Sequence, residues 1–275
     1  MPDRDFRASY GPWAVIAGAS EGIGEAFAEA LATRGLHLIL LARRADKLEA
    51  TADRIRRAHA VEVEAVACDL ADPELDAKIR AVLLTDGRER EVGLLVYNAA
   101  YSRMGEFFRQ SLADQLRAID VNCRGPVILT HVLGEAMIRR RRGGVILMGS
   151  LAGEGGSPRL ASYAASKAFN RVLAESLWAE LRPHGVDVLA CVAGATRTPG
   201  FEAVASTAKG PVMLPREVVD AALAKLGRGP VVVPGLGNLL GKLVMAQLPT
   251  RLRVQVMDLA TRGGGGSRED GSRSS

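Results

Sequence analysis

Short apolar segments alternate with helical segments along most of this chain, and this alternation constrains the fold more than any other feature. Near-continuous apolar strands indicate a sheet that is covered on both faces, and helices between strands require parallel βαβ units. Ligands of such sheets bind beyond the carboxyl ends of the strands. We therefore predict an α/β fold with a parallel sheet flanked by helices. The expected strands are residues 13–17, 38–41, 64–68, 94–97, 145–148, 186–192 and 231–233.

The chain is predicted to form a single domain. Its 275 residues are 48% hydrophobic and 24% charged, which excludes a disordered chain, a collagen and a coiled coil. No Pro- or Ser-rich linker divides the sheet pattern, so we place one domain at residues 1–262. Residues 263–275 have no apolar side chain to bury, and we expect them to be disordered.

Two segments near the carboxyl end depart from the strand and helix alternation. Residues 195–230 contain several Pro and Gly turns, and their length is typical of a functional lid, so they are our candidate substrate loop. Residues 236–259 are apolar but too interrupted for a membrane span. This extension is compatible with core packing, pocket cover, subunit contact or peripheral contact with a membrane surface.

The net charge of +5 does not point to nucleic acid, because the arginines are spread along the chain instead of forming a stripe with aromatic residues. The densest run, 139–142, is compatible with an acidic ligand but more typical of a solvated helix end. An odd number of scattered cysteines, and an amino-terminal segment without an apolar signal region, favour a reducing, cytoplasmic location.

A glycine-rich turn directly follows the first expected strand. It contains Gly18, Ser20, Gly22, Ile23 and Gly24, and it opens a helical pattern. Glycines let the backbone approach a pyrophosphate, and the free N–H groups of a helix N-terminus bind an anion. A purely structural turn is the alternative, but a position after the first strand of a βαβ series favours phosphate binding.

The ends of the second and third strands carry further candidates. Arg43 and Arg44 stand where an NAD-binding protein usually has a carboxylate, and guanidinium groups suit a 2′-phosphate, so NADP(H) is preferred over NAD(H). Arg44 is the weaker candidate, because the helix that follows could turn it to solvent. After the third strand, Asp69 and Leu70 reach the same edge; Asp69 either accepts from an adenine amino group or caps a helix.

A third group combines Ser150, Tyr163 and Lys167. Tyr163 and Lys167 are four residues apart on one face of a helix expected to begin at Ser157–Pro158. A nearby ammonium should lower the pKa of the phenol and make it a usable acid/base. Ser150 closes the fifth expected strand, where its hydroxyl could stabilise a substrate oxygen.

In this order along roughly residues 10–200, the motifs resemble those of the short-chain dehydrogenase/reductase family. The matching residues are Gly18, Gly22, Ile23, Gly24, Asn98, Ala99, Asn122, Ser150, Tyr163 and Lys167. The chain departs from the usual family pattern at Ala17, at Tyr97 and Ala100 around the Asn98–Ala99 pair, and at Ala193. Tyr97 and Ala100 stand where Asn and Gly are usual. None of these departures removes a catalytic group.

The resemblance implies a Rossmann-type, doubly wound sheet that binds NAD(P)(H). It implies that Tyr163 is the general acid/base, that Ser150 polarises a carbonyl, that Lys167 binds the nicotinamide ribose and that Asn122 supports a water-linked proton relay. Asn98 and Ala99 would help to hold the central strand and the cofactor. Gly194 and Thr198 match the segment placed against the nicotinamide amide, and Thr196 of the same segment is a further cofactor-binding candidate.

Together these features predict an NADP(H)-dependent oxidoreductase that acts on a ketone or secondary alcohol, without a metal, as a homodimer or homotetramer. The alternative is a non-catalytic regulatory or scaffold protein that binds NADP with the same fold. The expected pocket wall is apolar and favours a lipophilic substrate, such as an acyl chain or a steroid-like ring. It comprises Met104, Phe107, Leu151, Ala152, Gly153, Phe201, Val204 and Met213.

Overall fold

The computed structural model describes residues 5–85, 87–202 and 212–261. Within them, the main sheet confirms all seven strands expected from the sequence, with ends that differ by at most two residues. The apolar segments explain this agreement, because the inner strands of the sheet are buried on both faces, whereas the two edge strands are only partly buried. The strands are β1 (Trp13–Ala17), β2 (His37–Ala42), β3 (Val63–Ala67), β6 (Val92–Tyr97), β7 (Gly143–Ser150), β8 (Val186–Ala193) and β9 (Val231–Val232).

All seven strands are parallel and lie in the order β3-β2-β1-β6-β7-β8-β9. The chain winds outward from β1 in one direction and then in the other, so the strand order reverses between β1 and β6. This is the doubly wound, Rossmann-type arrangement, and a ligand crevice is expected where the order reverses. A short antiparallel pair, β4 (Leu84–Thr85) and β5 (Arg88–Glu89), stands apart from this sheet.

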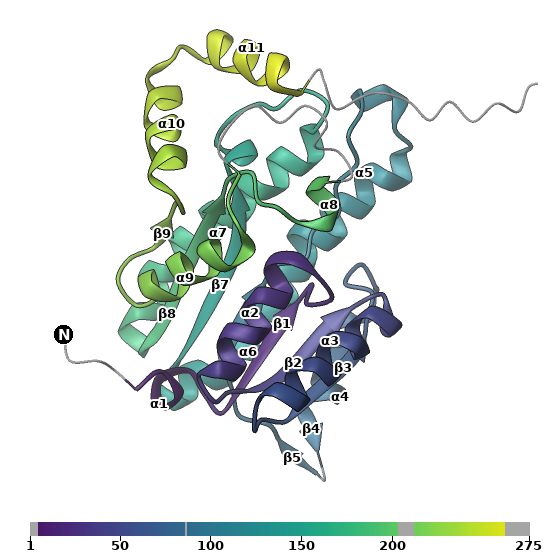
Figure 1. The fold of residues 1–275 in the computed structure, drawn as a ribbon, viewed down its shortest axis with the longest axis vertical. Helices are drawn as coiled ribbons and strands as arrows, with labels where there is room; N and C mark the ends of the chain where they lie inside the picture. The colour runs from purple at the N-terminus through teal and green to yellow at the C-terminus, as the bar shows by residue number, and fades with distance from the viewer. Residues whose placement is uncertain (1–4, 86, 203–211, 262–275) are drawn as a thin grey trace, which may run out of the picture.

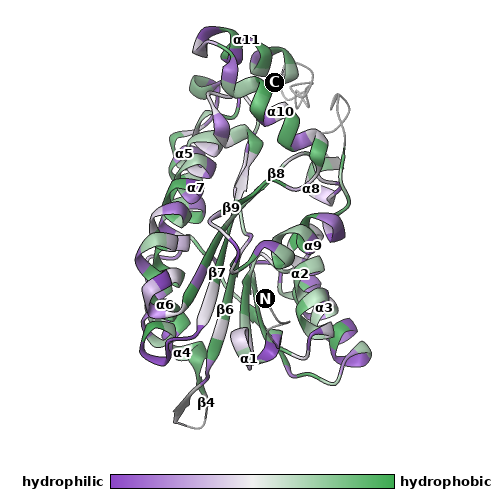
Figure 2. Cartoon of the chain, turned by 90° about the vertical axis from the view of Figure 1, so that its left-hand side faces the viewer, coloured by the Kyte–Doolittle hydropathy of each residue, from purple (hydrophilic) through white to green (hydrophobic). Residues whose placement is uncertain are grey.

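Helices cover both faces of the sheet (Figures 1 and 2). On one face, α2, α3 and α9 enclose a core with the side chains of β1 and β2, and on the other face α4, α6 and α7 enclose a second core. The helices are α1 (Phe6–Tyr10), α2 (Gly22–Thr33), α3 (Ala45–Ala58), α4 (Leu75–Leu83), α5 (Leu112–Ile119), α6 (Gly125–Arg140), α7 (Ala161–Leu181), α8 (Pro199–Glu202), α9 (Pro215–Lys225), α10 (Leu236–Gln247) and α11 (Thr250–Thr261).

The expected helix start at Ser157–Pro158 is wrong, because α7 begins at Ala161. Arg159 adopts a left-handed conformation with φ 64°, which no α-helix can continue through. The Ser157 hydroxyl instead donates to the carbonyl of Ala152. The face shared by Tyr163 and Lys167 is unaffected, since both lie inside the observed helix.

The expected substrate loop, 195–230, is only in part a loop. Residues 215–225 form α9, which packs against α2 and β8 and in which Val218, Val219 and Ala222 are buried. Their spacing of three and four residues is that of a helix, and this signal outweighs the nearby Pro and Gly. Residues 203–211, and the expected disordered tail 263–275, lie outside the described residues.

The arginine run 139–142 ends a helix, as its solvated interpretation predicts. Arg141 is the left-handed residue that ends α6, with φ 51°. Arg140 donates to the carbonyl of Val92, and Arg142 donates to the carbonyl of Ala8. These contacts lie at the amino ends of the strands, opposite the end where ligands bind.

Candidate active site

A cavity of about 830 Å³ opens at the carboxyl ends of the strands, at the reversal point between β1 and β6. This volume is within the ~300–1,000 Å³ usual for small-molecule sites. Its walls come from the turns after β1, β2, β3, β6, β7 and β8. Segments that are far apart in sequence therefore meet at this edge, as the parallel strands require.

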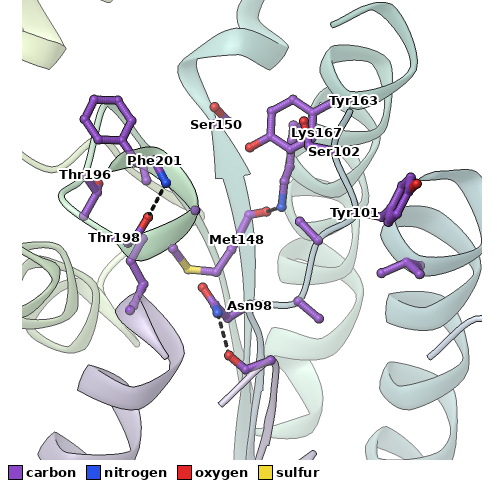
Figure 3. Close-up of a pocket in the computed structure, with 18 of the residues that line it drawn as sticks. Asn98, Tyr101, Ser102, Met148, Ser150, Tyr163, Lys167, Thr196, Thr198 and Phe201 are labelled. Atoms are coloured by element: carbon purple, nitrogen blue, oxygen red, sulfur yellow. Dashed lines mark hydrogen bonds between the residues drawn. The ribbon is translucent and has the colours of Figure 1, made fainter. Parts of the chain in front are cut away.

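The turn after β1 forms a close-packed backbone wall. Gly18 has φ 84°, and a β-carbon there would lie 2.7 Å from the backbone of Ala99. A β-carbon on Gly24 would lie 1.9 Å from the carbonyl oxygen of Gly18. Asn98 holds the turn in this position, because its Nδ2 donates to the Gly18 carbonyl at 3.0 Å (Figure 3). The glycines are thus required for the loop to pack against the end of β6.

The helix N-terminus in this wall suits an anion. Gly22 and Ile23, in the first turn of α2, line the cavity. Glu21, at the N-cap position, makes no side-chain hydrogen bond to the helix; its carboxylate instead pairs with Arg44 and Lys47. N–H groups without an internal partner, at the positive end of a helix dipole, fit the pyrophosphate of a dinucleotide.

Two cations border the same wall. Arg43 and Arg44 follow β2, line the cavity and are exposed. The Arg44 guanidinium lies 2.8 Å from the carboxylate of Glu21 and 3.2 Å from the Ser20 hydroxyl. Arg44 is thus exposed to solvent, as expected, but its guanidinium group also contacts the glycine-rich turn.

Asp69 lies at the end of the cavity that β3 borders, but it does not cap a helix. Its carboxylate pairs with Arg117 at 2.7 Å and accepts from the backbone N–H of Ala71. Burial acts to raise the pKa of Asp69, but these hydrogen bonds outweigh burial and leave it below the usual value. The side chain is thus held as a carboxylate, which can accept a hydrogen bond from a ligand.

The opposite wall brings Ser150, Tyr163 and Lys167 together (Figure 3). Ser150 ends β7, and its hydroxyl accepts from the N–H of Ala152 at 3.2 Å. Lys167 is 3% exposed and its Nζ donates to the carbonyl of Met148 at 2.9 Å. The same Nζ lies 5.7 Å from the centre of the Tyr163 ring. A hydroxyl, a phenol and an amine therefore meet where a substrate oxygen could bind.

The structure reverses the expected direction of the pKa of Tyr163. Burial raises the pKa of the phenol above its usual value, and the hydrogen bond with Ser150 only partly opposes this effect. Burial also lowers the pKa of Lys167 to about 8. The sequence argument counted the ammonium but not the loss of water around both groups. Near neutral pH the phenol is protonated and can act as an acid.

Asn122 is fully buried, and it does not line the cavity. Its Nδ2 donates to the Tyr101 carbonyl and to the Ser166 hydroxyl, both at 2.9 Å. Its Oδ1 accepts from the Tyr101 N–H at 2.7 Å. The carboxamide of Asn122 thus connects the loop after β6 with α7 by hydrogen bonds.

Most of the predicted cofactor-binding residues line the cavity, but Gly24 does not, because it packs against Gly18 behind the wall. Among the described residues of the expected apolar wall, Phe107, Gly153 and Met213 do not line it; Val204 lies outside the described residues. The residues that do line it as expected are Gly18, Ser20, Gly22, Ile23, Arg43, Arg44, Asp69, Leu70, Asn98, Ala99, Met104, Ser150, Leu151, Ala152, Tyr163, Lys167, Gly194, Thr196, Thr198 and Phe201.

Sequence reasoning missed several lining residues next to the motifs. Tyr101 and Ser102 continue the segment after Asn98, and Val121 precedes Asn122. Their closeness to recognised motifs at strand ends is the signal that could have found them. Ala260 carries no such signal, because only the folding of α11 over the cavity brings it there.

The extension 236–259 forms most of α10 and α11, which lie above the carboxyl ends of the strands (Figure 1). Lys242 pairs with Glu154 at 3.2 Å, and Asp258 pairs with Arg159 at 2.9 Å. Apolar side chains face outward; Leu236, for example, is 80% exposed. Core packing is therefore the wrong interpretation for this face. Of the described residues, none in 236–259 lines the cavity, although Ala260, the next residue of α11, does.

A comparison with protein families decides the classification. The model of the family described as short chain dehydrogenase matches residues 12–209. The chain belongs to the short-chain dehydrogenase family. In this family member, the motif residues named above all stand at the carboxyl ends of the strands or in the helices that follow them.

Two curated relatives are each 34% identical to this chain. One, a very-long-chain 3-oxoacyl-CoA reductase from Podospora anserina, matches 79% of this chain, but the match covers 64% of the relative. The chain thus spans less than two thirds of the length of that enzyme. The other, a 7beta-hydroxysteroid dehydrogenase from Clostridium sardiniense, matches 82% of this chain and 85% of the relative.

Solved structures show the same fold. A structure described for 7beta-hydroxysteroid dehydrogenase stereoselectivity has a TM-score of 0.83 at 29% identity, covering 91% of this chain and 98% of the other. A short-chain dehydrogenase from Sphingobium yanoikuyae in complex with NADPH has a TM-score of 0.75 at 31% identity, covering 87% and 97%.

Proposed function

We propose that this chain is an NADP(H)-dependent oxidoreductase that transfers a hydride between the nicotinamide and the carbon of a ketone or secondary alcohol. One observation carries the proposal: Ser150, Tyr163 and Lys167 meet on one wall of a cavity whose other wall is a glycine-rich turn at a helix N-terminus. A nicotinamide cofactor bound along the glycine-rich turn would bring its hydride to the same substrate that the catalytic wall protonates.

Each residue of the catalytic wall has a part in this reaction. NADPH, when bound, supplies the hydride. The Ser150 hydroxyl donates to the substrate carbonyl oxygen, and Tyr163 gives that oxygen its phenolic proton. Lys167, fixed by Met148, binds ribose hydroxyls and stabilises the phenolate left on Tyr163. In alcohol oxidation the same residues act in reverse.

The preference for NADP(H) over NAD(H) is supported by the two cations after β2. Arg43 and Arg44 both border the cavity, and no carboxylate directly follows that strand. A guanidinium group forms charge-assisted hydrogen bonds with a 2′-phosphate, which NADH lacks. The relative from Sphingobium yanoikuyae is described in complex with NADPH.

A lipophilic carbonyl compound, with an acyl chain or a steroid-like ring, is the proposed substrate class. Met104, Leu151, Leu160 and Phe201 line the cavity around the catalytic wall. The named relatives act on 3-oxoacyl-CoA and on hydroxysteroids, which are both of this class. Such substrates match apolar walls that carry a few polar groups at one end.

The test is a turnover assay with purified full-length protein. NADPH oxidation is followed with a panel containing a 3-oxoacyl-CoA, a keto steroid and a keto sugar, and Tyr163→Phe serves as the inactive control. We expect turnover of one or both lipophilic compounds and little of the sugar. Nucleotide binding without turnover of any compound would favour the scaffold alternative, and preferred turnover of the sugar would overturn the lipophilic class.

We predict that the enzyme is a homodimer or homotetramer in the cytoplasm and that residues 236–259 make peripheral contact with a membrane surface. In the described part of the chain, no helix is long and apolar enough to cross a membrane. The same residues contain no cluster of three or more side chains suited to a metal ion. The outward apolar side chains of α10 and α11 support a contact with a second subunit or a membrane surface.

A further inference from the structure

In the turn that carries Asn122, the backbone carbonyl of Val121 lacks the N–H partner that a helix would normally give it. Residues Asp120–Arg124 form a π-helical turn between α5 and α6, and the N–H of Gly125 donates to the carbonyl of Asp120. That N–H is the partner the Val121 carbonyl would have in an α-helix. The partner in a π-helix would be residue 126, a proline, which has no N–H. Neither the α-helical nor the π-helical hydrogen-bond pattern therefore supplies a backbone N–H to the Val121 carbonyl.

Tyr97 supplies the missing donor from the neighbouring strand. It ends β6, is 0% exposed, and its hydroxyl donates to the carbonyl of Val121 at 2.5 Å. Burial raises the pKa of this phenol, so it remains protonated and donates throughout the neutral range. Gly125 is required beside it, because a β-carbon there would lie 2.2 Å from the hydroxyl oxygen.

The π-helical turn is connected to the catalytic wall by hydrogen bonds. Asn122 donates to the Ser166 hydroxyl at 2.9 Å, and Ser166 donates to the carbonyl of Tyr163 at 2.7 Å. Asn122 also holds both backbone groups of Tyr101, which lines the cavity. A shift of the turn would move the loop after β6 and loosen the first turns of α7 together.

We propose that Tyr97 is a positioning residue for the reaction. Its hydrogen bond to the Val121 carbonyl is a brace that fixes the π-helical turn and thereby Asn122. Through the hydrogen bonds of Asn122 and Ser166, it keeps Tyr163 aligned. The inference rests on the proposed oxidoreductase function, because alignment of Tyr163 affects turnover only if Tyr163 transfers a proton.

The kinetic test compares Tyr97→Phe with Tyr10→Phe. Tyr10 is a matched control, since it is 6% exposed and its hydroxyl donates to Asp187 at 2.7 Å, at the amino ends of the strands. Leaving the Val121 carbonyl unpaired should lower kcat about tenfold for Tyr97→Phe, with the KM for NADPH nearly unchanged. Tyr10→Phe should keep the kcat of the parent protein.

A double-variant cycle separates positioning from general destabilisation. If Tyr97 acts through Asn122, adding Tyr97→Phe to Asn122→Ala should lower kcat little further. Tyr97→Phe should also increase the solvent deuterium isotope effect on kcat, because a misaligned phenol slows proton transfer. Independent, multiplying losses in the double variant, or an unchanged isotope effect, would overturn the positioning role.

Hydrogen exchange tests the brace without relying on turnover. Tyr97→Phe should speed amide exchange in residues 120–125, whereas Tyr10→Phe should not. Unchanged exchange in that segment would overturn the brace itself. Faster exchange in a protein whose parent shows no turnover would mean that the proposed function has failed while the brace stands. Melting curves of both single variants confirm that the comparison is made on folded protein.

Discussion

The two walls of the cavity are ordered by opposite means. On the wall after β1, the backbone packs closely because Gly18 and Gly24 lack side chains that would collide with it. On the wall formed by β7 and α7, buried side chains hold their positions by hydrogen bonds, as Lys167 does to Met148. The first wall should therefore be sensitive to added atoms and the second to removed atoms, and substitutions can test this difference.

The largest effect is expected on the catalytic wall, from Tyr163→Phe. Removing one hydroxyl should lower kcat by ~10²-fold or more while NADPH affinity stays nearly unchanged, because the proton donor is lost but the nucleotide wall is intact. Turnover and nucleotide titration measure the two quantities. Lys167→Ala is the comparison variant and should reduce both, and a near-normal kcat for Tyr163→Phe would refute the assignment.

On the nucleotide wall, side chains should matter at the 2′-phosphate. Loss of a charge-assisted contact is worth roughly 1.5–3 kcal/mol, so Arg43→Ala should weaken NADPH binding about tenfold to a hundredfold and leave NADH binding nearly unaltered. Titration of both nucleotides measures the change, and Arg44→Ala, measured in parallel, shows how the two cations share the contact. Adding Ala42→Asp should shift preference further toward NAD(H). Equal losses for both nucleotides would show that neither arginine reads the phosphate.

An added methyl group should damage the glycine wall. Gly24→Ala puts a β-carbon 1.9 Å from the Gly18 carbonyl oxygen, so α2 must move away from the turn. We expect NADPH binding to weaken about tenfold and the free energy of unfolding to fall by roughly 1–3 kcal/mol. Gly241→Ala is the matched control, because a β-carbon there meets nothing within 4 Å. Equal behaviour of the two variants would remove the distinction between the walls.

The pH dependence of turnover should report the buried amine. Burial lowers the pKa of Lys167 from 10.5 to about 8, so the amine is charged below that pH and neutral above it. Tyr163, whose pKa is raised, remains protonated over the same range. The rate of carbonyl reduction should therefore be level below ~pH 7 and fall about tenfold per pH unit well above 8.

Lys167→Arg tests the origin of that fall. A guanidinium group stays charged throughout the range, so this variant should be slower overall but should lose the decline above pH 8. The measurement is the pH profile of kcat/KM with NADPH for both proteins. If the decline persists at the same pH in Lys167→Arg, another group controls it and the catalytic wall does not depend on the charge of the amine.

The strands, and most lining residues, could be predicted because their signals are local. Short apolar runs separated by helical patterns predict strands without knowledge of the tertiary structure, and Gly18 and Tyr163 lie within recognisable motifs. The start of α7 could not, because it depends on the left-handed conformation of Arg159. Nor could the burial of Asn122, because its two hydrogen-bond partners, Tyr101 and Ser166, come from segments that only the folded sheet brings together.

The order of strands and helices, the glycine-rich turn and the residues that we propose to react can all be predicted from local sequence. The pKa values of those groups, and therefore their protonation, depend on the tertiary structure. The expected fall in the pKa of Tyr163 became a rise, because the loss of water around a buried phenol outweighs a nearby amine that is itself buried. Likewise, the bond from Tyr97 to Val121 spans 24 residues and exists only because β6 ends beside the π-helical turn. Burial and distance between remote segments are properties of the packed chain, and no local pattern encodes them.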